Sequence, residues 1–249
     1  MNFNKVKKII QENHYEFIHV ESTTSTMINI KKFLKTKNKN CIVLSDQQTA
    51  GKGRRGNSWY SPKGNIYFSI SFNNFFNLKR HFLFSILTAV SIKMTLEKFK
   101  AKNIKFKWPN DIFFENKKFS GIILESFKIS DDKSFMIVGC GINIESCPKI
   151  LQYSTTYVKK FCKLETLEEF LVAFYEILFF NWNLLIKNNY NNLVGIYTKS
   201  LMFIGEKITI KMDNNSSISG IFKRVNTDGS LQIENENRIF NLYNGTIQI

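Results

Sequence analysis

The sequence contains few residues of the kinds that bind zinc or form disulfide bonds. Four cysteines and three histidines occur among 249 residues, and no two cysteines have the Cys-x-x-Cys spacing. The histidines, at positions 14, 19 and 81, do not cluster with the cysteines. This scarcity indicates neither a disulfide framework nor a zinc centre, and it favours a reducing cytoplasm. We expect no resident metal site.

Long apolar runs are also missing. The longest apolar stretch, near 82–92, is shorter than the roughly 20 residues needed to cross a bilayer. The first 17 residues mix Lys, Asn and Gln with apolar residues and do not have the pattern of a signal peptide. We therefore expect a soluble, cytoplasmic protein with no membrane partner. With 43% hydrophobic residues, including 24 Phe, the chain can form one substantial core and a small second domain.

Acidic residues are too few to balance the basic ones. The chain has 35 Lys and Arg against 20 Asp and Glu, a formal charge of +15. This excess is typical of nucleic-acid-binding proteins, so a nucleic-acid-binding regulator is an alternative function. From Phe203 onward, however, five basic residues meet five acidic ones, and the upstream lysines are scattered without a stripe or an aromatic ladder. We therefore expect no nucleic-acid partner.

The most informative segment is 51–56, which reads Gly-Lys-Gly-Arg-Arg-Gly. Glycines allow positive φ angles, and consecutive amides in such conformations form a nest for anions. The cationic side chains add charge-assisted hydrogen bonds. The segment predicts a loop that holds an acidic, phosphate-bearing ligand; the alternative is a solvated basic turn.

Two known phosphate loops share part of this pattern, and both are excluded. A dinucleotide-binding loop requires a strand before it and a helix directly after it. A strand is expected at 41–44, but 66–72 has the alternation of a second strand, with Ile66, Phe68, Ile70 and Phe72 on one face. The Walker pattern is excluded because no Gly-Lys-Ser/Thr closes the loop.

A hydroxyl cluster at 22–26 precedes a predicted helix with apolar residues Met27, Ile30, Phe33 and Leu34. Ser25 or a neighbour is therefore a candidate N-cap. Capping needs only one hydroxyl, so the spare ones are available to a neutral polar ligand.

Segments 107–114 and 118–125 are predicted to be two strands joined by a polar turn. Lys118 enters the second, apolar strand, where its ammonium needs a partner unless it protects a sheet edge. Asn110 and Asp111 follow Pro109, which fits either turn chemistry or Mg²⁺ and water beside a nucleotide.

The remaining elements follow from periodicity. We expect helices at 5–13, 79–100, from the capping box at 166–169 through Leu185, and at 190–200, and strands at 104–108 and 135–138. The second of these strands ends in Gly139-Cys140-Gly141-Ile142-Asn143, whose glycines indicate close approach of a ligand to the backbone. From 204 onward, five short strands are expected at 207–212, 217–225, 231–234, 239–242 and 246–249, with turns at 214–215 and 228–229. They predict a small barrel-like module after a boundary at 200–205.

Taken together, these motifs resemble the biotin–protein ligases that modify carboxylase carrier proteins. The resemblance covers nearly the whole chain, and it depends most on the glycine-arginine loop, on Lys-Trp-Pro-Asn-Asp at 107–111 and on the later lysine, in that order. It implies an α+β fold, with a mixed sheet flanked by helices as in class II tRNA synthetase cores and a C-terminal SH3-like barrel. The implied domains are 1–202 and 203–249.

The resemblance also implies a function and a set of site residues. The activity would be ATP-dependent formation of biotinyl-5′-AMP with Mg²⁺ and transfer of biotin to a lysine of a biotin carboxyl carrier protein, with Arg54 and Lys118 as catalytic residues. The implied biotin-binding residues are Ser25, Thr26, Met27, Gln48, Lys52, Gly53, Arg54, Trp59, Lys118 and Gly121. The implied ATP- and adenylate-binding residues are Gly51, Lys52, Arg54, Arg55, Asn110, Asp111, Lys118, Gly139, Gly141 and Asn143.

The sequence departs from the pattern of this family at several points. Met27 follows the Ser-Thr pair where Asn is usual, and Lys52 stands where Arg is common, which keeps the charge but loses the guanidinium fork. Only 24 residues precede Ser25, too few for the winged helix-turn-helix of the larger repressor members, so we expect no repressor role. A lipoate ligase or octanoyl transferase is the nearest alternative, although those enzymes lack the 51–56 loop as written here.

Overall fold

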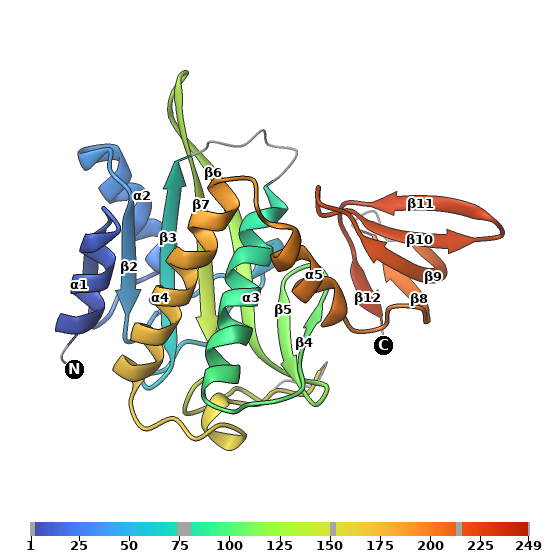
Figure 1. Cartoon of the computed structure of the whole chain (residues 1–249), viewed down its shortest axis with the longest axis horizontal. Coiled ribbons are helices and arrows are strands. Elements are labelled where there is room, and N and C mark those ends of the chain that lie inside the picture. Colours follow the sequence, from blue (N-terminus) through green and yellow to red (C-terminus); the bar gives the residue numbers. More distant parts are fainter. Residues whose placement is uncertain (1–2, 74–80, 150–152, 213–215, 249) are drawn as a thin grey trace.

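The computed structural model describes residues 3–73, 81–149, 153–212 and 216–248, and two β-sheets form its framework (Figure 1). The larger sheet has the order β1-β2-β3-β7-β6-β5-β4. Strands β1 and β2 pair in parallel, and each following pair in this order is antiparallel. The strands are β1 Glu16–Val20, β2 Cys41–Ser45, β3 Ile66–Asn73, β4 Ile104–Lys107, β5 Asp111–Phe114, β6 Lys117–Ser130 and β7 Lys133–Ile142. The predicted mixed sheet is confirmed.

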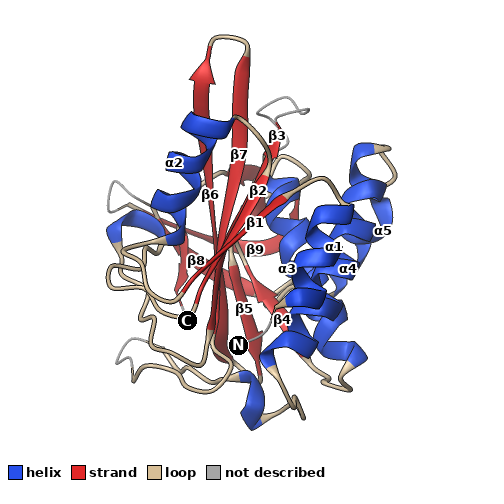
Figure 2. Cartoon of the chain, turned by 90° about the vertical axis from the view of Figure 1, so that its left-hand side faces the viewer, coloured by secondary structure: helices blue, strands red, loops and turns tan. Residues whose placement is uncertain are grey.

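Helices cover both faces of this sheet, as Figure 2 shows. Helices α1, α3, α4 and α5 lie on one face, where α4 packs on α1 and α3, and α2 lies alone on the other. The helices are α1 Asn4–Glu12, α2 Thr26–Lys37, α3 Phe82–Lys98, α4 Leu167–Ile186 and α5 Asn191–Lys199. All five expected helices are present; positions 79–80 of the third expectation lie outside the described residues.

Because helices lie on both sides, the central strands are buried on both faces. The predicted apolar face of β3 is buried, but so are Tyr67, Ser69 and Ser71 on the other face. The serines are tolerated there because each has a partner: Ser71 Oγ accepts from the backbone N–H of Cys41 at 2.9 Å. The predicted apolar face of β3 is confirmed, and the alternation gave no sign that the opposite face is buried as well.

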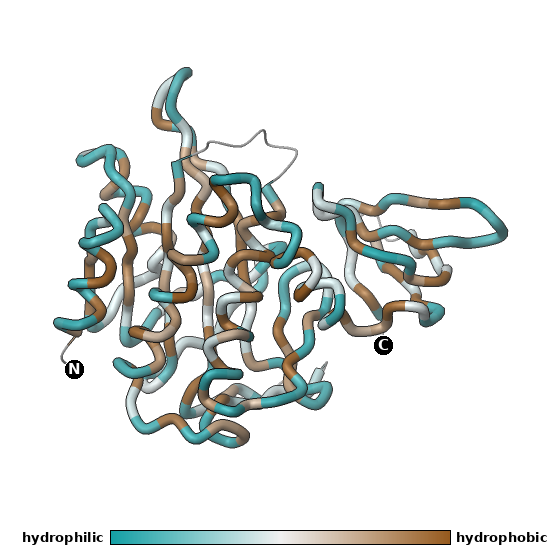
Figure 3. The backbone as a smooth tube through the Cα atoms, in the orientation of Figure 1, coloured by the Kyte–Doolittle hydropathy of each residue, from teal (hydrophilic) through white to brown (hydrophobic). Residues whose placement is uncertain are grey.

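Strands β6 and β7 are longer than the predicted 118–125 and 135–138. They continue as a hairpin to Ser130 and Lys133 beyond the edge of the sheet (Figure 1). The tip of this hairpin is hydrophilic (Figure 3). Main-chain pairing between the two strands forms it, and Phe127 and Ile129 of β6 pack, partly buried, against the smaller core cluster that contains Met27 and Leu34.

Helix α4 corrects the expectation that no apolar stretch of this chain is long enough to cross a bilayer. Its 20 residues are long and apolar enough to cross a membrane by composition alone, and 56% of the most apolar window is buried in the protein. Figure 3 shows brown and teal alternating along this helix. Phe170, Phe174 and Leu178 belong to the core between the helices and the sheet, so packing accounts for the apolar composition.

The C-terminal part forms a second, antiparallel sheet in the order β11-β10-β9-β8-β12. Its strands are β8 Lys207–Lys211, β9 Ser217–Val225, β10 Leu231–Asn235, β11 Arg238–Leu242 and β12 Thr246–Gln248. The five predicted strands are confirmed, and the turn expected at 214–215 lies outside the described residues. Among the described residues no pairing joins β11 to β12, so the sheet is open and closure into a barrel stays a prediction.

Candidate functional site

A cavity of about 900 Å³ lies where the glycine loop, the central strands and the C-terminal sheet meet. Most of the residues predicted to bind a ligand line it, although they come from segments far apart in the sequence. Two predicted residues do not: Gly51 does not line it, and Asn143 lines a smaller neighbouring cavity.

The cavity has a neutral polar end at the start of α2. The backbone N–H and the hydroxyl of Thr26 both donate to Gln48 Oε1, at 2.9 and 3.2 Å. Ser69 Oγ donates to Thr26 Oγ1 at 2.8 Å, and Gln48 Nε2 donates to Ser61 Oγ at 3.1 Å. Ser25 also lines this end. The network fixes hydroxyl and amide groups in place before any ligand binds.

Ser25 occupies the N-cap position of α2, as predicted, but its hydroxyl does not cap the helix. The expectation that this hydroxyl bonds a helix amide is therefore wrong. The first-turn amide of Thr26 is satisfied by the Gln48 side chain instead. The reason is spatial: the segment after β2 places Gln48 across the start of the helix, and sequence periodicity carries no signal of that contact.

Met27 and Gly139 form the apolar floor beside this network. A Cβ atom on Gly139 would lie 2.8 Å from Met27 Sδ and 2.9 Å from Cγ1 of Ile123. Gly139 is therefore required by the side chain of Met27 as well as by the predicted approach of a ligand. The neighbouring thiol of Cys140 is neutral at physiological pH, because burial raises its pKa to about 12 against a smaller opposing effect of its contact with Ser120.

Trp59 lies over two glycines of the sheet. A Cβ atom on Gly141 would lie 2.2 Å from Trp59 Nε1, and one on Gly121 would lie 3.1 Å from its ring. Side chains at these two positions would displace the indole from the wall. Among the described residues, the buried indole N–H has no hydrogen-bond partner.

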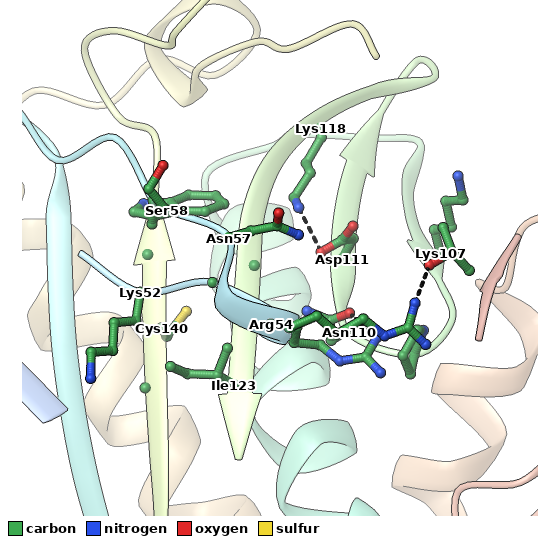
Figure 4. Close-up of a pocket in the computed structure, with 18 of the residues that line it drawn as sticks. Lys52, Arg54, Asn57, Ser58, Lys107, Asn110, Asp111, Lys118, Ile123 and Cys140 are labelled. Atoms are coloured by element: carbon green, nitrogen blue, oxygen red, sulfur yellow. Dashed lines mark hydrogen bonds and ion pairs between the residues drawn. The ribbon is translucent and has the colours of Figure 1, made fainter. Parts of the chain in front are cut away.

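Lys118 stands at the cationic part of the cavity with a carboxylate partner. Its Nζ lies 2.8 Å from Asp111 Oδ1, an ion-pair distance, although the angles fall short of a hydrogen bond. The same Nζ lies 5.3 Å from the centre of the Trp59 ring and 5.2 Å from that of Tyr153. Figure 4 shows Lys118 reaching toward Asp111. The lysine is thus held by a carboxylate and two aromatic rings rather than exposed at a sheet edge.

The glycine loop crosses the cavity as a compact turn. Gly53 N–H donates to the carbonyl of Asn57 at 2.7 Å, and Trp59 N–H donates to the carbonyl of Gly51 at 2.8 Å. A Cβ atom on Gly51 would lie 2.5 Å from the carbonyl oxygen of Trp59. This glycine is therefore needed for the close approach of two backbone segments, which explains why it does not line the cavity.

The cationic side chains of the loop point in different directions. Arg54 Nη1 donates to Asn110 Oδ1 at 3.1 Å, and Lys52 points away from both Arg54 and Lys118 (Figure 4). Asn110 in turn donates to the carbonyl of Ile122 at 2.9 Å. Arg54 and Lys118 thus each have a partner from the 110–111 segment, and their contact with a carboxylate and a phosphate stays a prediction.

Several lining residues were not predicted, and Lys107 and the C-terminal residues 245–248 are among them. Lys107 belongs to the Lys-Trp-Pro-Asn-Asp block, but no role was predicted for it. The pKa of Lys107 is lowered, mainly by burial; nearby Asp111 opposes this shift and Lys118 adds to it. Gly245 and the strand Thr246–Gln248 come from the C-terminal sheet. The sequence predicted a strand at 104–108, which contains Lys107, whereas nothing in the sequence placed 245–248 near the loop.

A smaller cavity of about 210 Å³ lies beside Trp59 and Lys118. Asn143 lines it, and Asn143 Nδ2 donates to the carbonyl of Thr156 at 3.2 Å. Its Oδ1 is buried and has no hydrogen-bond partner in the part of the chain that the structure describes. Tyr153, also missed, contributes an aromatic wall, so this cavity combines a ring and an unused buried acceptor.

Comparisons with known proteins agree with this geometry. The model of the biotin/lipoate A/B protein ligase family matches residues 17–143. The bifunctional ligase/repressor BirA of Escherichia coli is 31% identical over 102 residues, which are 41% of this chain and 32% of BirA. The biotin–[acetyl-CoA-carboxylase] ligase of Paracoccus denitrificans is 31% identical over 108 residues, 43% of this chain and 45% of that protein. The chain thus spans about a third to just under half of the length of these relatives.

Among solved structures, the biotin protein ligase of Aquifex aeolicus in complex with biotin and ATP has a TM-score of 0.76 at 26% identity. That likeness covers 94% of this chain and 97% of the other. The family match includes the start of α2, the glycine loop, Lys118 and Gly139 to Gly141. Since it extends over about half of the sequence, this chain belongs to the biotin/lipoate A/B protein ligase family.

Proposed function

We propose that the protein is an ATP-dependent biotin–protein ligase, which activates biotin to biotinyl-5′-AMP and transfers it to a lysine of a biotin carboxyl carrier protein. The observation that carries this proposal is the charge of the large cavity. Its lining contains five cationic side chains and one carboxylate, next to the neutral polar end at Thr26 and Gln48. An acyl adenylate with a polar, uncharged head matches a cavity that is neutral at one end and cationic elsewhere.

The neutral end suits the ureido group of biotin. A ureido group offers two N–H donors and one carbonyl acceptor, and the hydroxyls of Ser25 and Thr26 can serve either kind of group. Gln48 orients Thr26 and lines the same end. Met27 supplies an apolar floor for the sulfur-containing ring. We assign Trp59 to the apolar wall along the ring and the tail.

The cationic part suits the carboxylate and the phosphates. In the first step a carboxylate oxygen of biotin attacks the α-phosphorus of ATP, the bond to the bridging oxygen breaks, and pyrophosphate leaves. Arg54 and Lys118 counter the negative charge at this point, and each charge-assisted hydrogen bond contributes about 1.5–3 kcal/mol. Orientation of two bound reactants contributes about 7–11 kcal/mol more. These contributions support catalysis without a covalent enzyme intermediate.

In the second step a lysine amine of the carrier attacks the acyl carbon, and AMP leaves with the electron pair of the broken C–O bond. The amine loses a proton on the way to the amide. Asp111 is the single carboxylate of the cavity lining, and it stands beside Lys118 at 2.8 Å. We assign it to orienting the incoming amine or the cation that accompanies ATP.

Mg²⁺ fits this site only as the companion of ATP. The described residues contain no group of three His, Cys, Asp or Glu side chains that would hold a metal. Mg²⁺ commonly binds through one or two carboxylates, substrate phosphates and water, so the lone Asp111 is compatible with that arrangement. The cation would neutralise phosphate charge.

The smaller cavity is assigned to the adenosine part. The Asn143 Oδ1 acceptor has no partner within residues 3–73, 81–149, 153–212 and 216–248, and an adenine amino group would supply a donor. Tyr153 offers a ring for stacking. We further propose that 1–202 and 203–249 act as two domains and that the second sheet closes as an SH3-like barrel.

ATP–pyrophosphate exchange tests the proposal directly. The purified chain with ATP, Mg²⁺ and labelled pyrophosphate should exchange label only when biotin is present. Lipoate and octanoate in place of biotin test the nearest alternative, since a lipoate ligase would exchange with lipoate. Exchange that does not depend on biotin would contradict the proposed function.

A further inference from the structure

One row of neighbouring residues crosses the first sheet beside the neutral polar end of the large cavity. Ser69 of β3 lies opposite Gly139 of β7, and Gly139 in turn lies opposite Ile123 of β6. Side chains directly opposite each other in antiparallel strands project from the same face of the sheet. The row therefore has a hydroxyl at one end, no side chain in the middle and an aliphatic side chain at the other end.

Met27 fills the space that the glycine leaves. A Cβ atom on Gly139 would lie 2.8 Å from Met27 Sδ and 3.1 Å from Met27 Cγ. Met27 is only 4% exposed, because it packs with Ile30 and Leu34 in the smaller apolar cluster. It nonetheless lines the large cavity, together with Ile123 and Gly139. These three residues form a floor that is apolar and well packed.

The three residues of this floor offer no hydrogen-bond donor to a ligand. The side chains of Met27 and Ile123 have no N–H or O–H group, and a thioether sulfur is only a weak acceptor. The N–H and carbonyl of Gly139 face neighbouring strands, because β7 lies between β3 and β6. At the other end of the row, Ser69 Oγ donates to Thr26 Oγ1 at 2.8 Å and is engaged as well.

The head group of biotin has the same division into a polar and an apolar part. Its ureido ring carries two N–H groups and a carbonyl, and the ring fused to it carries a thioether sulfur. With the ureido ring at Ser25, Thr26 and Gln48, the sulfur ring lies over Met27 and Gly139. A thioether needs no hydrogen-bond donor. An S=O oxygen does need one, because burial of an acceptor without a partner is costly.

We propose that Met27 is a specificity-determining residue, whose floor admits the thioether form of biotin and rejects the sulfur-oxidised forms. This inference rests on the proposed function, because it takes the head group to be that of biotin. It deepens that function by defining the oxidation state of the substrate. The protein then activates biotin and leaves oxidised biotin unused, although both compounds have the same ureido group and the same carboxylate.

The test compares biotin with biotin sulfone, which has an oxygen on each face of the sulfur ring, so that turning the ring over does not remove oxygen from the floor. ATP–pyrophosphate exchange gives kcat/KM for each compound, and the ratio of the two values is the readout. A variant that only disturbs folding lowers both values and leaves the ratio unchanged. We expect the wild-type protein to prefer biotin about ten- to hundredfold, the range for one buried polar group without a partner.

Substitutions of Met27 test whether this residue sets the ratio. Met27→Gln places an amide donor in the floor at similar length and should reduce the preference about fivefold or more. Met27→Ser supplies a smaller donor and should reduce the preference as well. Met27→Leu keeps the floor apolar at nearly constant volume, so its ratio should stay within about twofold of the wild type.

Met94→Gln is the matched control, because it makes the same change away from the cavity. Met94 on α3 is partly buried, its Sδ lies 3.6 Å from Asn181 Nδ2, and it does not line the cavity. Its ratio should equal that of the wild type.

Three results would each overturn the inference: a wild-type preference below about threefold, well short of the cost of an unpartnered buried group, an unchanged ratio in a folded donor variant, or an equal fall in Met27→Leu. Wild-type protein without biotin-dependent exchange would instead refute the proposed function, and the inference with it.

Discussion

At the scale of single residues, Lys118 shows how a buried cation is kept in an apolar strand. Transfer of an ammonium out of water is costly unless it is paired. Here the carboxylate of Asp111 and the faces of Trp59 and Tyr153 surround it. These contacts hold its charge in place before a ligand arrives.

Lys118→Gln should lower kcat/KM for biotin-dependent exchange about ten- to hundredfold, because the variant loses a charge-assisted contact with the carboxylate and the phosphate. Lys93→Gln is a matched control: Lys93 is as buried as Lys118, with 14% of each side chain exposed, and pairs with Glu97 on α3. The control should keep wild-type exchange. Exchange in Lys118→Gln within twofold of the control would contradict the assignment.

The sequence predicted that Lys118 needs a partner, but not which one. Asp111 reaches it because the register between β5 and β6 shifts between Ile112 and Phe113. Such a bulge depends on how two strands meet and leaves no mark in the alternation of either strand. The hydrogen bond between Arg54 and Asn110 was not predictable either, because it joins residues 56 positions apart in the sequence.

At the scale of elements, the capping of α4 was readable from the sequence. Thr166 Oγ1 accepts from the backbone N–H of Glu169 at 3.1 Å, and Glu168 and Glu169 lie in the first turn. Local chemistry within four residues decides this contact, so the prediction is confirmed. The lengths of β6 and β7 were misjudged because pairing with a partner strand decides them.

Thr166→Ala should reduce the free energy of unfolding by about 1 kcal/mol, the usual cost of losing an N-cap. The measurement is urea denaturation followed by circular dichroism. Thr36→Ala, in the last turn of α2, is the control; its hydroxyl bonds carbonyls of its own helix, so stability should stay within about 0.5 kcal/mol. Equal losses of unfolding free energy in both variants would show that the N-cap of α4 contributes no more to stability than the hydroxyl of Thr36.

At the scale of the whole molecule, the two sheets meet at Trp108 and Gly229. The change to a pattern of short strands from 204 onward predicted a separate module, and the second sheet confirms the five strands. Neither the open arrangement of that sheet nor its contact with the motif at 107–111 could be predicted. Residues 121 positions apart form this contact, and single-sequence patterns describe only near neighbours.

Trp108→Phe should destabilise the second sheet, because it leaves the buried carbonyl of Gly229 without a donor at a cost of about 1–3 kcal/mol. Hydrogen exchange resolved by segment is the measurement, and amides of β9 and β10 should lose protection while those of β3 keep theirs. Trp182→Phe, where the ring packs against Phe72 and Phe84, is the comparison and should affect β3 instead. Unchanged protection of the β9 and β10 amides in Trp108→Phe would mean that other contacts hold the second sheet in place.

The position of Trp59 has an optical consequence. Its indole forms the partition between the two cavities, next to a charged ammonium and with an unbonded N–H. The emission of an indole depends on the polarity and charge around its ring, so occupation of either cavity alters the light it emits. The protein thus carries a natural fluorophore at the centre of its candidate site, and titrations can be followed without attaching a dye.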